Sequence, residues 1–327
     1  MPGQPSAEVQ QLSVIVLTGA NRASAQQTLE DIAQQTIREK IQLVVVDFAP
    51  LDVADLDTRG LRCAYLRHPE FRSLARGKAA GIRASHSGIV AFIENHCRPS
   101  PEWAEKVLAA FSGPWTAIGY AFVNGSPDSY RSRAALLADY APWAYPVNSG
   151  ECRHMPGNNI AYRKEFLDSL EPDLGRIFGV DFNVHEILLE RGGKMYVEAE
   201  AIAAHQCFES WIEVFAANFA YVRVLAATRA RNQAWRTPKR VVAALAALVL
   251  VPPLRFWRLL RTLPGRKGMA ARLAASLPVL LPAYYVCAVA ESAGYAFGGG
   301  DAEERLLYWE LDRVRESTAS TPAAGVV

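Results

Sequence analysis

Three polar side chains directly follow a short apolar run in the middle of the chain. Residues 89–93 are all apolar, and Glu94, Asn95 and His96 come immediately after them. A carboxylate and an imidazole can bind a divalent cation, and the amide between them can donate or accept a hydrogen bond. This pair suits Mn²⁺ better than Mg²⁺, which prefers oxygen ligands alone. The alternative is that Glu94 and His96 only cap the helix that follows.

The apolar run has the pattern of a strand that is buried on both faces of a parallel sheet. Pro101 then begins a predicted helix, whose apolar stripe includes Trp103 and Val107. The polar triplet is therefore predicted at the carboxyl end of a central strand, where open α/β sheets bind their ligands.

The segments before the triplet predict the rest of that sheet. Residues 13–18 and 41–46 are apolar runs, residues 61–66 are a third candidate strand, and Ser24 is a candidate N-cap for a helix between the first two. Apolar runs separated by helices predict a parallel sheet built by right-handed crossovers. Asp47 ends the second run, where a turn or helix-cap carboxylate is the alternative to a binding role.

These segments, in this order, resemble the catalytic domain of family-2 glycosyltransferases of the GT-A fold. The strand, the triplet and Pro99-x-Pro101-x-Trp103 resemble that family's Asp-rich cluster and Pro-x-Pro-x-Trp, with Glu94, Asn95 and His96 at the acidic positions. Glu94-x-His96 is similar to the Asp-x-His that holds manganese in some other GT-A enzymes. The resemblance implies that a divalent metal, Mn²⁺ or Mg²⁺, binds here.

The resemblance also implies donor-binding residues near the two flanking strands. Asn21 follows the first strand as in the family's opening turn. Asp47 stands at the first Asp of Val-Asp-Asp-Gly-Ser, which contacts the nucleobase, whereas Phe48 replaces the second Asp. In the small-residue helix of residues 73–86, Lys78 stands at an Arg position. Lys78 is therefore a candidate phosphate ligand, and a solvated basic helix face is the alternative.

Two later segments complete the resemblance. Residues 155–164 look like the family's Gly-x-Asn-x-Ala-Phe-Arg-Arg, which implies that Gly157 and Asn159 border the donor sugar and acceptor; a plain Gly-Asn turn is the alternative. Asp181 matches the general base of inverting members, although Val180 replaces the preceding Glu. An acceptor hydroxyl needs such a base because it is a poor nucleophile until its proton is taken. His205 matches a terminal His that joins the metal or diphosphate shell.

The composition excludes several classes of protein. The 327 residues carry a net charge of +2, which is no polyanion-binding signature, so we expect no nucleic-acid partner. The five cysteines are scattered without a CxxC pair, which indicates free thiols in a reducing compartment and no zinc knuckle. The polar residues 1–12 lack an apolar core and predict no signal peptide.

The composition changes after Cys207. Aromatic and aliphatic residues at helical spacing, followed by arginines, predict an amphipathic interfacial helix. Residues 241–254 are apolar but are expected to be broken at Pro252 and Pro253, and residues 273–297 are long enough to span a bilayer. The basic connection between them would face outward if both spanned. A hairpin or re-entrant pair is therefore favoured over two spanning helices or a helical bundle packed on the catalytic domain.

Together these observations predict an α/β protein with the GT-A fold, in which a Rossmann-like, mostly parallel sheet precedes membrane-associated helices. The expected parts are a flexible tail (1–12), a catalytic domain (13–206), membrane-associated helices (207–300), and a charged helix with a disordered tail (301–327). The predicted protein is an inverting glycosyltransferase at the cytoplasmic face of the membrane, using a nucleotide-sugar donor and a glycan or lipid-linked acceptor. The alternative is a non-catalytic GT-A-like module that binds nucleotide or glycan, or scaffolds an envelope assembly.

Overall fold

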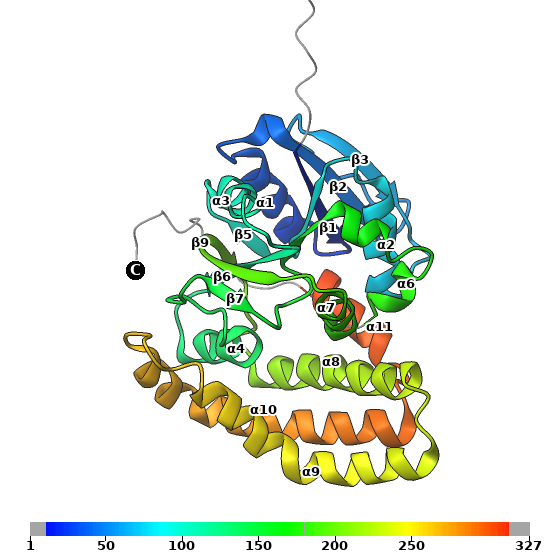
Figure 1. Ribbon diagram of the computed structural model, residues 1–327, viewed down its shortest axis with the longest axis vertical. Helices are drawn as coiled ribbons and strands as arrows, with labels where there is room; N and C mark the ends of the chain where they lie inside the picture. The colour runs from blue at the N-terminus through cyan, green and yellow to red at the C-terminus, as the bar shows by residue number, and fades with distance from the viewer. Residues whose placement is uncertain (1–10, 180, 314–327) are drawn as a thin grey trace, which may run out of the picture. The chain divides into compact units, whose positions relative to one another are not determined.

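The computed structural model describes residues 11–179 and 181–313, with the side chains of residues 181 and 182 excepted. The chain divides into two compact units (Figure 1). The first contains residues up to 121 and residues 148–203, and the second contains residues 122–147 and 204–321. This division differs from the predicted one because residues 122–147 group with the C-terminal helices. Of the predicted terminal parts, 1–12 and 301–327, residues 1–10 and 314–327 lie outside the described residues.

Four parallel strands form one side of the sheet in the first unit. Their order is β3 (Arg62–Arg67), β2 (Ile41–Asp47), β1 (Leu12–Thr18) and β4 (Ile89–Phe92). The register pairs Leu12 with both Ile41 and Ile89. All residues of β1, β2 and β4 are buried, as the apolar runs predicted for strands covered on both faces.

The sheet becomes antiparallel beyond β4. Strand β8 (Ile160–Arg163) pairs antiparallel with β4 on one side and with β6 (Ala117–Asn124) on the other. The described order continues to β9 (Met195–His205) and β5 (Cys97–Pro99), while β7 (Gly150–Cys152) pairs with β9. Because Ile160 pairs with Phe92, the residues just before β8 meet the carboxyl end of β4.

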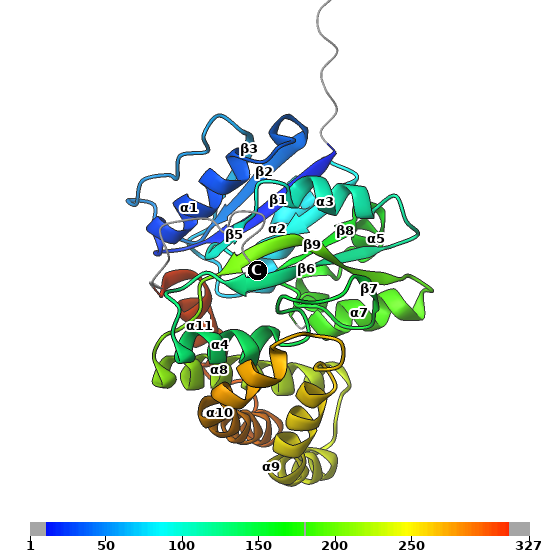
Figure 2. The same cartoon turned by 90° about the vertical axis from the view of Figure 1, so that its left-hand side faces the viewer.

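Helices cover both faces of the parallel strands. Figure 1 and Figure 2 show α1 (Arg22–Ala33) and α3 (Trp103–Ala110) on one face and α2 (Leu74–Ala84) on the other. The remaining helices of this unit are the 3₁₀ turn η1 (Arg38–Lys40), α5 (Lys164–Asp168), α6 (Leu174–Ile177) and α7 (Asp181–Glu190). The prediction that Ser24 caps α1 is wrong: Asn21 is the N-cap, and its side chain accepts a hydrogen bond from the Ser24 amide.

Two glycines bring α2 close to the sheet. A Cβ atom at Gly77 would lie 2.3 Å from Leu17 and 2.7 Å from the ring of Phe48, and one at Gly81 would lie 2.7 Å from Ile15. Such distances are far below normal contact, so neither position admits a larger residue without rearrangement. The small residues of this helix therefore serve close packing on the sheet.

The second unit is helical apart from its strand ends. It contains α4 (Tyr130–Tyr140), α8 (Trp211–Asn232), α9 (Thr237–Leu260), α10 (Met269–Phe297), α11 (Ala302–Leu307) and a π-helical turn (Tyr308–Asp312). Figure 1 shows α8, α10 and α9 side by side. The predicted break at Pro252 and Pro253 is wrong, because α9 continues through both prolines. Each proline removes one hydrogen bond, whereas α9 stays packed on α10 through Ala244, Ala247 and Val251.

Among the described helices, α9 and α10 are long and apolar enough to cross a membrane. They differ in burial: 17% of the apolar window of α9 is buried, against 50% for α10. By composition and exposure, these two helices are the part of the described chain suited to membrane association.

Candidate functional site

Two adjacent asparagines donate hydrogen bonds to the two carboxylate oxygens of Glu94. The Asn159 amide donates to Oε2 at 2.6 Å, and the Asn158 amide donates to Oε1 at 3.1 Å. The Glu94 backbone amide in turn donates to the Asn159 side-chain oxygen at 3.1 Å. Both asparagines precede β8, so the antiparallel pairing with β4 is what brings them to Glu94. The predicted pair Glu94 and Asn159 is thus brought together, and Asn158 is an addition.

His96 lies beside that carboxylate. Its Nε2 is 3.6 Å from Glu94 Oε2, and its ring is buried. Nδ1 lies 2.9 Å from the Asn95 side-chain oxygen, which is an acceptor and therefore places the ring proton on Nδ1. In that tautomer, an uncharged imidazole would present the Nε2 lone pair toward Glu94. A carboxylate oxygen facing such a lone pair is a donor set that suits a divalent cation.

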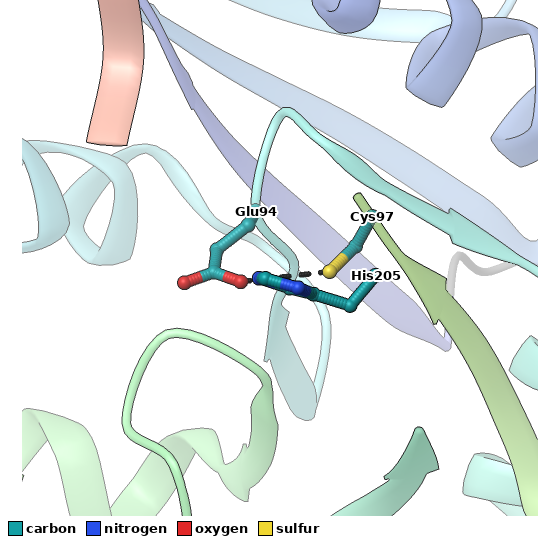
Figure 3. A group of neighbouring side chains, drawn as sticks. All are labelled: Glu94, Cys97 and His205. Atoms are coloured by element: carbon teal, nitrogen blue, oxygen red, sulfur yellow. Dashed lines mark hydrogen bonds between the residues drawn. The ribbon is translucent and has the colours of Figure 1, made fainter. Parts of the chain in front are cut away.

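Cys97 is a third group at this position, and the sequence analysis did not select it. Figure 3 draws Glu94 and Cys97 on the segment after β4, together with His205 at the end of β9. Cys97 is buried, and its Sγ lies 3.5 Å from Glu94 Oε2. His205 is in the second unit, where its Nδ1 lies 3.3 Å from Cys207 Sγ and its ring packs against Tyr140. Its role as a metal ligand stays a prediction.

Lys78 is buried rather than part of a solvated basic face. Its side chain lies in the interior of the first unit, and its ammonium donates to the Gly157 carbonyl oxygen at 3.1 Å. The rings of Phe92 and Phe178 each have their centre 5.9 Å from the same nitrogen. These contacts stabilise a buried cation. They also connect α2 to the segment that carries Asn158 and Asn159.

Asp47 is fully buried at the end of β2, and its carboxylate accepts hydrogen bonds from other residues of the protein. Arg22 donates to both oxygens at 3.0 and 2.9 Å, the Tyr65 hydroxyl donates at 2.6 Å, and the Ala49 amide donates at 3.0 Å. Arg67 lies 3.5 Å away. Burial, followed by the hydrogen bond to Asp47, raises the pKa of Tyr65, so the phenol remains a donor.

Thr18 marks the same edge of the sheet. It is the last residue of β1 and pairs in register with Asp47. Its side chain is buried, and its Oγ1 has no hydrogen-bond partner. A buried hydroxyl without a partner is costly unless a ligand satisfies it. Periodicity could not have identified it, because an apolar run ending in Thr reads only as a strand.

For the two remaining predicted residues, the structure gives the position in the secondary structure. Asn21 caps α1, and Asp181 is the first residue of α7. The side chain of Asp181 lies outside the described residues, so its role as a base stays a prediction. His185 lies one turn later on α7. It is buried, with Nε2 3.1 Å from the Tyr162 hydroxyl.

Comparison with known proteins identifies the domain. Residues 13–170 match the model of glycosyl transferase family 2. This matched part, a little under half of the chain, is similar to that family. The matched range contains the parallel strands, Glu94, His96 and the Gly157–Asn159 segment.

Two solved structures of glycosyltransferases are similar to the chain. Mannosyltransferase PcManGT from Pyrobaculum calidifontis, in complex with GDP-Man and Mn²⁺, is 18% identical, with a TM-score of 0.53 and 89% of each chain covered. TarS of S. aureus is 12% identical, with a TM-score of 0.43, and the match covers 84% of this chain and 55% of that one. No curated protein sequence matches the chain. The likeness to PcManGT shows that this family-2 glycosyltransferase has the GT-A fold.

Proposed function

We propose that this family-2 glycosyltransferase moves a sugar from a nucleotide-sugar donor to a hydroxyl group of a glycan or lipid-linked acceptor, with inversion at the anomeric carbon. The observation that carries the proposal is the fixed carboxylate of Glu94, which Asn158 and Asn159 hold beside His96 at the carboxyl end of β4. This is the edge at which α/β sheets bind ligands. PcManGT, with the same fold, was solved with GDP-Man.

A divalent metal, Mn²⁺ or Mg²⁺, is proposed as the cofactor. Glu94 and His96 would hold it, with His205 as a third ligand on the basis of the sequence motif. When bound, the ion would neutralise charge on the leaving diphosphate. The oxygen and nitrogen donors favour Mn²⁺ over Mg²⁺. The presence of Mn²⁺ in the PcManGT complex supports this assignment.

The remaining residues divide between donor binding and proton transfer. We assign the donor nucleotide to the ends of β1 and β2, where Thr18 presents its unpartnered hydroxyl and Asp47 holds Arg22 and Tyr65. Asp181 takes the proton of the acceptor hydroxyl as the new glycosidic bond forms. The donor sugar would lie against Gly157 and Asn159.

The proposed location is the cytoplasmic face of a membrane. The five cysteines are all free, which fits a reducing compartment. The exposed apolar side chains of α9 supply the attachment.

The second candidate is a non-catalytic GT-A-like module. It is favoured by Asp47, whose carboxylate is filled by Arg22, Tyr65 and the Ala49 amide instead of being open to a nucleobase. Under this reading, nucleotide would bind weakly or not at all.

Calorimetry separates the two candidates. UDP, GDP and TDP are titrated into the protein with Mn²⁺, with Mg²⁺ or with a chelator, and the wild type is compared with His96→Ala. We expect metal-dependent binding of one nucleotide that His96→Ala abolishes. The matched control is His86→Ala, because His86 is exposed, lies two residues after α2 and is not one of the proposed site residues. If nucleotide affinity depended neither on metal nor on His96, the proposed metal site would be excluded. If no nucleotide bound, the non-catalytic module would be favoured.

A second variant tests the proton transfer. Asp181→Asn keeps the shape of the side chain but removes the base. We expect nucleotide binding to be retained and turnover of the matching nucleotide sugar to fall by about a hundredfold or more. Equal turnover in Asp181→Asn and wild type would exclude this residue as the base.

A further inference from the structure

Helix α9 has an exposed apolar face. Val242, Leu245 and Val249 are 67%, 64% and 71% exposed, and their spacing places them on one side of the helix. The opposite side, with Ala244 and Val251, is buried in the core of the second unit. Further exposed apolar residues on α9 include Val241, Leu248, Leu250, Leu254, Trp257 and Leu260.

The charge-free part of α9 is shorter than the hydrocarbon core of a bilayer is thick. Arg240 and Arg255 bound residues 241–254, which contain no charged side chain. A helix of that length extends about 21 Å, whereas the hydrocarbon core is about 30 Å thick. Apolar segments of this length lie in the interface or are buried in a protein core. Because the outward face of α9 is exposed, the structure leaves the interface as the suitable environment.

The connection between α9 and α10 and the first turn of α10 form hydrogen bonds with the segment that follows α4. Arg266 donates to the carbonyl oxygens of Ala141 and Pro146 at 2.7 and 2.6 Å, and also to that of Ala144. Arg272 donates to the Tyr145 carbonyl at 3.1 Å. Burial lowers the pKa of Arg266 to about 10, so its guanidinium is charged at neutral pH. This basic connection therefore stays on the side of the membrane where residues 141–146 lie.

At the other end of the helix pair, hydrogen bonds join α9 to α10 and α8 to the residue that follows α10. Arg240, near the start of α9, donates to the Tyr295 carbonyl at 2.7 Å, and Arg223 of α8 donates to the Gly298 carbonyl at 3.0 Å. A Cβ atom at Gly294 would lie 2.6 Å from the Arg223 carbonyl oxygen, so α10 is in backbone contact with α8. Helix α8 carries charged residues along its length and is not one of the described helices suited to crossing a membrane. Helix α10 cannot cross a bilayer while it lies along α8.

We propose that α9 lies in the plane of an anionic membrane surface, with Val242, Leu245 and Val249 among the acyl chains, and that neither α9 nor α10 spans the bilayer. Exposed basic residues at both ends of α9, among them Lys239 and Arg258, match the negative headgroups. The glycosyltransferase would thus be held on one leaflet, next to membrane-embedded acceptors. The sequence alone left several arrangements possible. The proposal selects attachment to one side of the membrane and rejects two spanning helices.

Vesicle flotation tests this surface with the full-length protein. The protein is mixed with vesicles of phosphatidylcholine and phosphatidylglycerol, or of phosphatidylcholine alone, without nucleotide or metal. We expect stronger flotation with the anionic vesicles, and Leu245→Glu/Val249→Glu should lower the bound-to-free ratio about tenfold or more. Leu51→Glu is the matched control, because Leu51 is 77% exposed in the first unit. Equal thermal melting of the variants verifies folding, and equal flotation of wild type and the double variant would overturn the proposal.

A second readout separates an in-plane helix from a spanning pair. Trypsin is added outside vesicles to which the protein has bound. An in-plane α9 leaves the exposed Lys267 outside, so cleavage at the connection should match that of the free protein, and alkaline carbonate should release the protein. Protection of Lys267 together with resistance to carbonate would show that the helices span. Because neither assay involves sugar transfer, failure here is distinguishable from failure of the proposed function.

Discussion

The ammonium group of Lys78 donates a hydrogen bond to the carbonyl oxygen of Gly157 at 3.1 Å. Gly157 directly precedes the two asparagines that hold the carboxylate of Glu94. A buried cation on α2 thus fixes the segment that orients the central carboxylate. We therefore assign Lys78 as a positioning residue, which acts through Asn158 and Asn159.

Replacing Lys78 should weaken donor binding more than it alters the fold. Lys78→Met removes the hydrogen bond from the ammonium to the Gly157 carbonyl, and a hydrogen bond to a charged group contributes about 1.5–3 kcal/mol. We expect a higher KM for the nucleotide sugar with a smaller change in kcat, and partial rescue by Lys78→Arg. The control is Arg76→Met, because Arg76 is exposed on the same helix. If both Met variants behaved alike in steady-state kinetics, Lys78 would have no special role.

Thr18 offers a test in which stability and binding should move in opposite directions. Thr18→Val removes a buried hydroxyl that has no partner in the protein, so we expect the same or a higher melting temperature. If the hydroxyl meets the donor nucleotide, nucleotide affinity should fall about fivefold, because a hydrogen bond contributes about 1 kcal/mol. Thermal melting and calorimetry measure the two effects. Unchanged affinity in the variant would remove Thr18 from the nucleotide site.

Asp47 should matter for stability whether or not it touches a nucleobase. Asp47→Ala leaves Arg22 and Tyr65 without their shared acceptor, and breaking a buried ion pair costs about 3–5 kcal/mol. Because Arg22 is 22% exposed at its side chain, we expect the lower end of that range. Chemical denaturation measures it. Asp57→Ala is the control, since Asp57 is 59% exposed and should cost under about 1 kcal/mol; equal losses would contradict this account.

Two thiols should resist modification at neutral pH. Burial raises the pKa of Cys63 to about 11 and that of Cys152 to about 12. The thiolate is the reactive form, so alkylation at pH 8 should be slower in the folded protein than in guanidinium. The unfolded thiols ionise at a lower pH than the folded ones. The contribution of these two thiols to the free energy of unfolding is therefore complete below about pH 8.5 and is lost as the pH rises toward 11. Mass spectrometry of alkylated peptides measures the rates, and equal rates in both states would contradict the shift.

Much of the parallel sheet was predictable because its strands are buried on both faces. The apolar runs of β1, β2 and β4 can satisfy that burial only in a covered parallel sheet. The same runs could not reveal the antiparallel insertion of β8, since pairing direction depends on distant residues. The N-cap of α1 and the continuity of α9 through its prolines were also missed, because local rules of similar strength compete at such positions.

The sequence alone indicated which residues could form a site and which family they resemble. The tertiary structure decided what each of them contacts. It shows Lys78 buried and bonded to the Gly157 carbonyl, and it brings Asn158 and Cys97 to the carboxylate of Glu94. It also shows the Thr18 hydroxyl without a partner among the described residues and pairs the carboxylate of Asp47 with Arg22. The physical reason is that motif spacing fixes positions along a strand. Lys78 and the Gly157 carbonyl that it bonds are 79 residues apart in the chain, and such segments meet only when the sheet is assembled.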